Sequence, residues 1–124
     1  MPEARFDWRR ARLRKHADYE RVYQASRRYR SDSMTYFFRV REAEEPEGAE
    51  PRVGLTTGRV LGKAVERNRI RRRMREAVRL HLGELPARMD VVLHPRRMVL
   101  EMDFARLEQE VSRVFAAAAA GAKR

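Results

Sequence analysis

Hydrophobic and polar residues recur along the chain with periods that predict both helices and strands. Near the start, Tyr19, Val22, Tyr23 and Ser26 follow the spacing i, i+3, i+4, i+7. Residues with this spacing share one face of a helix. We therefore expect a helix over about residues 17–27 that turns these side chains toward the rest of the protein.

Three later segments have the composition of β-strands. Residues 33–41, SMTYFFRVR, are rich in aromatic side chains, and residues 52–57, RVGLTT, follow a polar connection that contains Pro and Gly. The run 89–94, MDVVLH, is almost entirely apolar, as in a strand buried on both faces. We expect the first two strands to pair as a hairpin across the connection at 42–51, a flexible, solvated loop.

The segment 64–83 predicts a long helix with two unlike faces. At 100° per residue, its apolar side chains lie within about 80° of one direction. This stripe should face the core and comprises Ile70, Met74, Ala77, Val78 and His81. The opposite side carries Asn68, Arg72, Arg75 and Arg79. Gly83 and Pro86 should end the helix.

The two ends of the chain differ in character. Residues 1–15 form a basic N-terminal extension. A final helix is expected to begin after Asp103, a favourable N-cap residue, and to bury Leu107 and Val111. Its alanine-rich end, residues 116–124, should be a helical tail that frays. The chain of 124 residues is expected to form a single domain.

The net charge of the chain and its distribution reduce the number of possible functions. The formal net charge is +11 and the sequence pI is about 11.2, which point first to nucleic acid and second to an anionic membrane surface. Residues 59–79 alone hold nine cations and two acids, whereas residues 42–50 hold five Glu. Most of the cations are Arg, whose planar fork binds phosphate in a bidentate way. We therefore predict that the helix over 64–83 binds RNA.

Other functional classes find little support. The chain has no Cys, which removes disulfides, thiolate zinc sites and a Cys nucleophile and fits the cytoplasm. No apolar run approaches the length of a membrane span, roughly 18 residues, and a membrane-surface helix would need bulky aromatic anchors in its apolar stripe. His16, His81 and His94 are scattered without metal-ligand spacing. We predict no catalytic and no metal-binding residue, which disfavours a self-sufficient nuclease.

The segment 54–79, GLTTGRVLGKAVERNRIRRRMREAVR, resembles the signature of the bacterial ribonuclease P protein subunit. The residues that match are Arg59, Gly62, Ala64, Val65, Arg67, Asn68, Arg69, Arg72 and Arg75. The segments 12–23, 52–55 and 90–96 also resemble parts of this family, so that nearly the whole chain is covered in order. The chain departs from the family where Val60 replaces a frequent Lys and where His94 and Pro95 replace apolar and small residues.

The resemblance implies a fold. The predicted order of helix, strands, basic helix, strand and helix already indicates an α+β sandwich. The resemblance refines it to a two-layer α/β sandwich with a mixed sheet and the element order α-β-β-β-α-β-α. The family's βαβ crossover around the basic helix is left-handed, although general topology rules favour a right-handed one. We expect this chain to follow the family.

The resemblance also implies a function. The family's protein is a subunit of the ribonuclease P ribonucleoprotein and binds both the catalytic RNA and the 5′ leader of precursor tRNA, promoting maturation of the tRNA 5′ end. The RNA carries the active site and most of the Mg²⁺, so the protein is not an enzyme by itself. We expect cytoplasmic localisation, no membrane partner and no obligate protein partner.

Two sets of site residues follow from the charge pattern and the resemblance. The predicted RNA-binding residues are Arg59, Lys63, Arg67, Asn68, Arg69, Arg71, Arg72, Arg75 and Arg79. The resemblance assigns the leader-binding cleft to Tyr19, Tyr23 and Phe37, whose rings would stack on bases with little sequence preference. The alternative is a general or ribosome-associated RNA-binding protein with no enzymatic role. The ordered motif separates this alternative from the ribonuclease P interpretation.

Overall fold

The computed structural model describes residues 8–123. Its helices are α1 (Trp8–Ala11), α2 (His16–Ala25), α3 (Ala64–His81) and α4 (Phe104–Ala122). Its strands are β1 (Tyr29–Arg30), β2 (Met34–Val40), β3 (Arg52–Leu55) and β4 (Met89–Pro95). Short 3-10 helices lie at η1 (Arg59–Leu61), η2 (Leu82–Glu84) and η3 (Arg97–Leu100). The α+β class and the expected helices and strands are confirmed, most of them to within about two residues.

The strand order corrects one prediction. The four strands form a mixed sheet in the order β1-β2-β4-β3. β4 pairs with β2 in the antiparallel sense and with β3 in the parallel sense. The predicted hairpin between residues 33–41 and 52–57 is therefore wrong, because β4 lies between them. An almost wholly apolar strand is best buried at the centre of the sheet, and β4 occupies that place.

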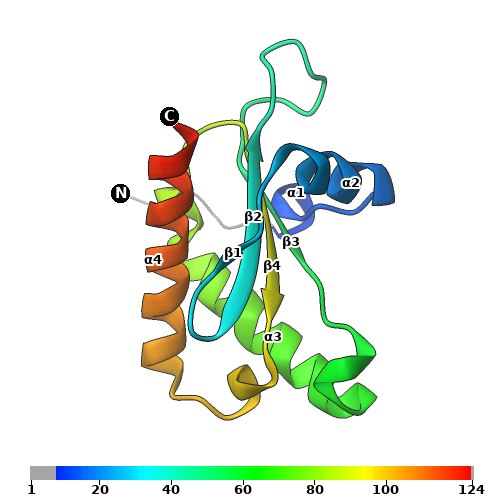
Figure 1. Ribbon diagram of the computed structural model, residues 1–124, viewed down its shortest axis with the longest axis vertical. Helices are drawn as coiled ribbons and strands as arrows, with labels where there is room; N and C mark the ends of the chain where they lie inside the picture. The colour runs from blue at the N-terminus through cyan, green and yellow to red at the C-terminus, as the bar shows by residue number, and fades with distance from the viewer. Residues whose placement is uncertain (1–7, 124) are drawn as a thin grey trace.

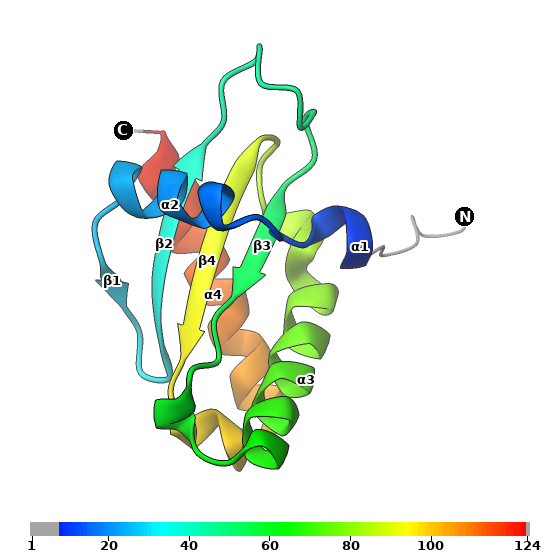
Figure 2. The same cartoon turned by 90° about the vertical axis from the view of Figure 1, so that its right-hand side faces the viewer.

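Helices cover both faces of the sheet (Figure 1). Helices α3 and α4 pack on one face, and α2 crosses β2 and β4 on the other, as Figure 2 shows. The predicted two-layer sandwich describes the first of these faces, and α2 adds a smaller layer on the second. The chain passes from β3 to its parallel neighbour β4 through α3. The left-handed sense of this crossover stays a prediction.

The main core lies between the sheet and the two long helices. Four of the five residues in the predicted stripe of α3, Ile70, Met74, Ala77 and Val78, are fully inaccessible there, whereas the fifth, His81, is only partly buried. The four inaccessible residues pack with residues of α4 that include Leu107 and Val111. Burial of these apolar side chains supplies the main stabilisation of the fold.

Contacts near both ends of residues 8–123 attach these segments to the rest of the fold. Residues 1–7 of the predicted N-terminal extension lie outside the described residues. Within the remainder, Leu13 is buried and its backbone N–H donates to the carbonyl of Val53 at 3.0 Å. At the other end, α4 continues to Ala122 and Ala118 is fully buried. Fraying of the alanine-rich tail stays a prediction. At Gly121 the ring of Phe38 comes so close that a Cβ would lie 2.6 Å from it.

A network of charges joins the sheet, α2 and the acidic connection. Asp90 on β4 is buried and accepts hydrogen bonds from Arg41 and Arg52. Arg52 also lies 3.5 Å from the carboxylate of Asp18 on α2. Arg41 donates to the carbonyls of Gly48 and Glu50, at 2.9 Å and 2.5 Å. The connection expected to be flexible is thus tied to the sheet at two backbone carbonyls.

We expect Asp90→Ala to lower the free energy of unfolding by about 3–5 kcal/mol, because it leaves the inaccessible guanidinium of Arg41 without its carboxylate. The nearly isosteric Asp90→Asn should also be strongly destabilising. The control is Asp32→Ala, which removes an 84% exposed carboxylate 3.8 Å from Arg106 and should cost less than about 1 kcal/mol. Urea unfolding measures the free energy of unfolding of all three variants. Equal losses for Asp90→Ala and Asp32→Ala would contradict this role.

His81 should make stability depend on pH. Burial alone would lower its pKa, but hydrogen bonds from its two ring nitrogens to Glu84 and Glu108 outweigh burial and raise the pKa. The stabilisation that protonated His81 contributes through Glu84 and Glu108 is fully present below the pKa of histidine in the unfolded state, about 6.5. It is lost as pH rises through the higher folded-state pKa.

Thermal melts on either side of neutral pH test this. The wild-type protein should lose more Tm toward alkaline pH than His81→Gln does. The control His16→Gln alters an imidazole that is 88% exposed and should keep the wild-type pH dependence. Identical pH dependence in wild type and His81→Gln would exclude the ion pairs as its cause.

Candidate RNA interface

The start of α3 is fixed by contacts around Gly62 and Glu66. Gly62 has a φ of +125°, which favours glycine, and a Cβ there would meet Arg97 and Glu66 at 2.4 Å. One carboxylate oxygen of Glu66 accepts the backbone N–H of Lys63 at 2.9 Å, and the other accepts from Arg97 at 2.8 Å. The bond from Arg97, followed by that from Lys63, lowers the pKa of Glu66 to about 2. This acid within the basic segment is therefore used to fix the helix start.

Three of the predicted RNA-binding side chains are exposed without a hydrogen-bond partner among residues 8–123. They are Arg59 on η1, Lys63 at the N-cap of α3, and Arg72 on its outer face. The helix N-terminus adds partial positive charge next to Lys63. Within residues 8–123 no carboxylate is paired with Arg59 or Arg72, whereas Lys63 interacts electrostatically with Glu66 but forms no ion pair with it. These cations are therefore available to phosphate.

A second group of arginines points toward β3 and α1. Arg71 donates to the hydroxyl of Thr57, just after β3, and to the side-chain oxygen of Asn68, both at 2.7 Å. Arg75 lies over the ring of Trp8, 5.4 Å from its centroid. Arg67 shares this side of the helix, and its Nε is shielded from solvent. These contacts hold the guanidinium groups in place beside β3.

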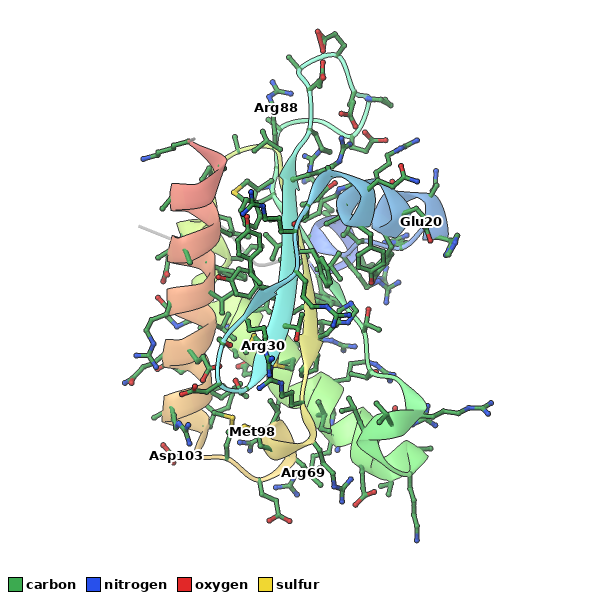
Figure 3. The ribbon with its side chains drawn as sticks, in the orientation of Figure 1. Glu20, Arg30, Arg69, Arg88, Met98 and Asp103 are labelled. Atoms are coloured by element: carbon green, nitrogen blue, oxygen red, sulfur yellow. The ribbon has the colours of Figure 1, made fainter. Side chains whose placement is uncertain are left out.

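The other flank of α3 serves the fold. Arg73 donates to the carbonyls of Val99 and Met102 and lies over the ring of Phe104. Arg69 donates from Nε to the carbonyl of Leu100 at 3.2 Å, at the end of the molecule where Figure 3 labels it. Arg69 is exposed, so its remaining donors stay accessible, whereas Arg73 is committed to the protein.

Arg79 completes the predicted set at the C-terminal part of the helix. It is exposed and forms a bidentate pair with Glu76, with contacts of 2.7 Å and 2.8 Å. Hydrogen bonds from Arg79 lower the pKa of Glu76. An RNA phosphate would have to compete with this carboxylate, so Arg79 is a weaker candidate than Arg72.

The predicted aromatic residues come together on the other face of the sheet. Tyr19 and Tyr23 project from α2, and Phe37 projects from β2 beneath them. The ring centroids of Tyr23 and Phe37 are 4.9 Å apart, and those of Tyr19 and Tyr23 are 6.5 Å apart. Both tyrosines are half-buried, whereas Phe37 is only 9% exposed. The two tyrosines can therefore present ring surface to a base, and Phe37 supports them from below.

The backbone at Gly54 allows this arrangement. A Cβ there would lie 2.7 Å from the ring of Tyr19, so that glycine lets this ring rest on β3. The hydroxyl of Tyr19 donates to the carbonyl of Leu13 at 3.4 Å. Burial, followed by repulsion from Tyr23, raises the pKa of Tyr19. Its hydroxyl stays protonated at neutral pH and remains a donor.

His94 also belongs to this cluster, although the sequence had not indicated it. Its imidazole contacts both Tyr23 and Phe37, with centroid distances of 5.7 Å and 5.2 Å. The available signal was alternation in β4, which places His94 on the same face as Val92, opposite to Leu93. Only the strand order brings this position next to Phe37.

Across residues 8–123, no group of three or more histidine, aspartate and glutamate side chains is arranged to hold a metal ion. In the same part of the chain, every helix is too short or too polar to cross a bilayer.

The fold and the site define a small α+β protein with an arginine-rich helix and a separate aromatic cluster. The model of the Ribonuclease P family matches residues 8–119. The ribonuclease P protein component of Brucella suis is 38% identical over 109 residues, covering 82% of this chain and 75% of the relative. That of Desulfovibrio desulfuricans is 34% identical over 105 residues, covering 83% and 78%. The chain belongs to the ribonuclease P protein family.

Solved structures support the same fold. A ribonuclease P protein from Staphylococcus aureus aligns with a TM-score of 0.71, covering 87% of this chain and 94% of that protein. The protein from Thermotoga maritima aligns with a TM-score of 0.70, covering 84% and 94%. Each is 24% identical in sequence. These two structures therefore show the fold. The family match and the two relatives support a protein component of a tRNA-processing ribonuclease over a general RNA-binding protein.

Two adjacent arginines offer a sharp test of the RNA face. Arg72→Ala should reduce affinity for structured RNA and lower the slope of log K against log salt by about 0.7–0.9, the value for one lost phosphate contact. Its thermal stability should stay unchanged. Arg73→Ala should lower the free energy of unfolding by about 1.5–3 kcal/mol, because two carbonyls lose a charged donor.

Salt titrations of RNA binding and thermal melts of both variants separate these effects. The RNA affinity of Arg73→Ala should be compared at a temperature where the variant is folded. An unchanged salt slope in Arg72→Ala would show that the outer face of α3 does not contact phosphate.

Proposed function

We propose that this protein binds the catalytic RNA of ribonuclease P and the 5′ leader of precursor tRNA, and so promotes maturation of the tRNA 5′ end. The observation that carries the proposal is the division of α3. The apolar side chains of Ile70, Met74, Ala77 and Val78 are fully buried. Three cations in and beside the helix, Arg59, Lys63 and Arg72, stay exposed without a hydrogen-bond partner among residues 8–123. Such cations bind phosphate strongly and with little sequence preference.

The catalytic RNA is the better partner for the arginine face. A large folded RNA presents phosphates at defined positions, which a rigid helix can match by shape. The arginine side chains around Arg71 and Arg75 are already held by Thr57 and Trp8. Preorganised side chains lose less entropy on binding, which favours a stable complex.

The tRNA leader is the better partner for the aromatic cluster. A leader is single-stranded, and its bases are free to stack on the half-buried rings of Tyr19 and Tyr23. Stacking needs no particular base, and one protein must accept many leaders. The cluster and α3 lie on different elements, so one protein can contact both RNAs at once.

The chemistry of cleavage belongs to the RNA in this proposal. Among the described residues, no group of three or more carboxylates and imidazoles is arranged to hold a metal ion that could activate water. We therefore place the Mg²⁺ ions on the RNA. The protein's cations reduce phosphate repulsion and help both RNAs approach. We place the complex in the cytoplasm, without an obligate protein partner.

A reconstitution experiment tests the two surfaces separately. Arg59→Ala with Arg72→Ala should raise the protein concentration needed for half-maximal cleavage, and saturating protein should restore much of the rate. Tyr23→Ala should instead raise KM for precursor tRNA at saturating protein. The increase should correspond to roughly 1–3 kcal/mol of lost stacking free energy. Binding of mature tRNA should hardly change, and thermal melts should show that each variant is folded.

Two outcomes would refute the proposal. Contaminant-free cleavage by the isolated protein would show that the RNA is not the catalyst. Equal weakening of precursor and mature tRNA by Tyr23→Ala would show that the aromatic cluster does not bind the leader.

A further inference from the structure

His94 lies at the end of the sheet face that α2 covers. On β4, the side chains of Val92 and His94 share this face, and their partners in the adjacent strand β2 are Phe37 and Thr35. Val92 is fully buried beneath α2, whereas His94 is half-buried. His94 therefore stands where the covered part of the face gives way to the accessible part.

The imidazole makes a defined contact with Tyr23. Nε2 of His94 and the hydroxyl oxygen of Tyr23 are 2.8 Å apart, within hydrogen-bond distance. The two rings are nearly perpendicular, at 86°, and Tyr23 meets Phe37 at 80°. The ring of Tyr23 is thus held by two perpendicular neighbours and by one hydrogen bond at its tip.

His94 is suited to pair with a hydroxyl. Burial, together with the charge of Arg28, lowers the pKa of His94, so the ring is neutral at neutral pH. A neutral imidazole has one donor and one acceptor nitrogen, and a hydroxyl can bond to either. Among residues 8–123, nothing else bonds to a nitrogen of this ring, so the contact with Tyr23 is its specific polar interaction.

We infer that His94 is a positioning residue of the aromatic cleft, which holds the Tyr23 ring in the orientation that stacks on an RNA base. The inference rests on the proposed function of the cleft. A half-buried tyrosine on a ten-residue helix can adopt other rotamers, and a base would then have to bind while the ring becomes ordered. A bond that fixes the ring in the free protein removes this cost from binding.

A double-mutant cycle in the reconstituted ribonucleoprotein tests this inference. Tyr23→Phe keeps the ring and removes the hydroxyl, and His94→Phe keeps a ring and removes the nitrogen. Each change should weaken binding of precursor tRNA by about two- to tenfold, the effect expected of one hydrogen bond. Mature tRNA should bind as in the wild type. The double variant should be no weaker than the single variants, because both remove the same bond.

His94→Gln provides the matched control. Its amide can still bond to the Tyr23 hydroxyl, so it should recover most of the affinity that His94→Phe loses, and this recovery should disappear when Tyr23 is Phe. A purely structural role would lower thermal stability and weaken precursor and mature tRNA alike. If His94→Phe does not fold, His94→Gln still tests the inference. Its affinity for precursor tRNA is then compared between the protein with Tyr23 and the protein with Tyr23→Phe.

Several results would overturn the inference: wild-type affinity in His94→Phe, effects of the two changes that multiply in the double variant, or equal weakening of mature tRNA. Tyr23→Ala separates this failure from failure of the proposed function. If Tyr23→Ala weakens precursor binding while His94→Phe does not, the cleft binds the leader and His94 plays no part. If Tyr23→Ala has no effect, the proposed function of the cleft is itself wrong.

Discussion

The structure depends on burying one side of α3 while the rest of that helix carries a high density of arginine. Like charges at a spacing of four residues repel one another, as Arg67, Arg71 and Arg75 do here, and an isolated helix with this sequence would be weakened. Burial of the Ile70 and Met74 stripe against α4 and the sheet offsets this repulsion. Packing in the core thus stabilises a helix whose cationic surface would weaken it in isolation.

The second face of the sheet has a different mode of stabilisation. Within residues 8–123, a small apolar cluster holds α2 there, and the charge network around Asp90 supplements it. Arg52 links Asp90 to Asp18 on α2, so the same network that ties down the acidic connection also helps to position the helix carrying Tyr19 and Tyr23. Stability of the sheet and geometry of the aromatic cleft are therefore linked through buried charges.

Much of the candidate site could be predicted from local patterns. A helical period separates the buried stripe from the arginine face without any tertiary information, since both lie on one element. Local patterns could not predict which arginines stay exposed and which bond to the rest of the protein. Arg72 and Arg73 are neighbours in sequence, yet one is exposed and the other bonds to the carbonyls of Val99 and Met102. That difference arises because η3 packs against only one flank of α3.

By itself, the sequence determined the class of fold, the main helices and strands, and the basic surface, because each depends on periodicity and charge within a short segment. Only the tertiary structure decided the strand order, the attachment of residues 8–15 and the packing of the alanine-rich end of α4. It also placed His94 beside Tyr23, 71 positions earlier in the chain. These features depend on contacts between distant segments, and several pairings of apolar strands satisfy the same local pattern.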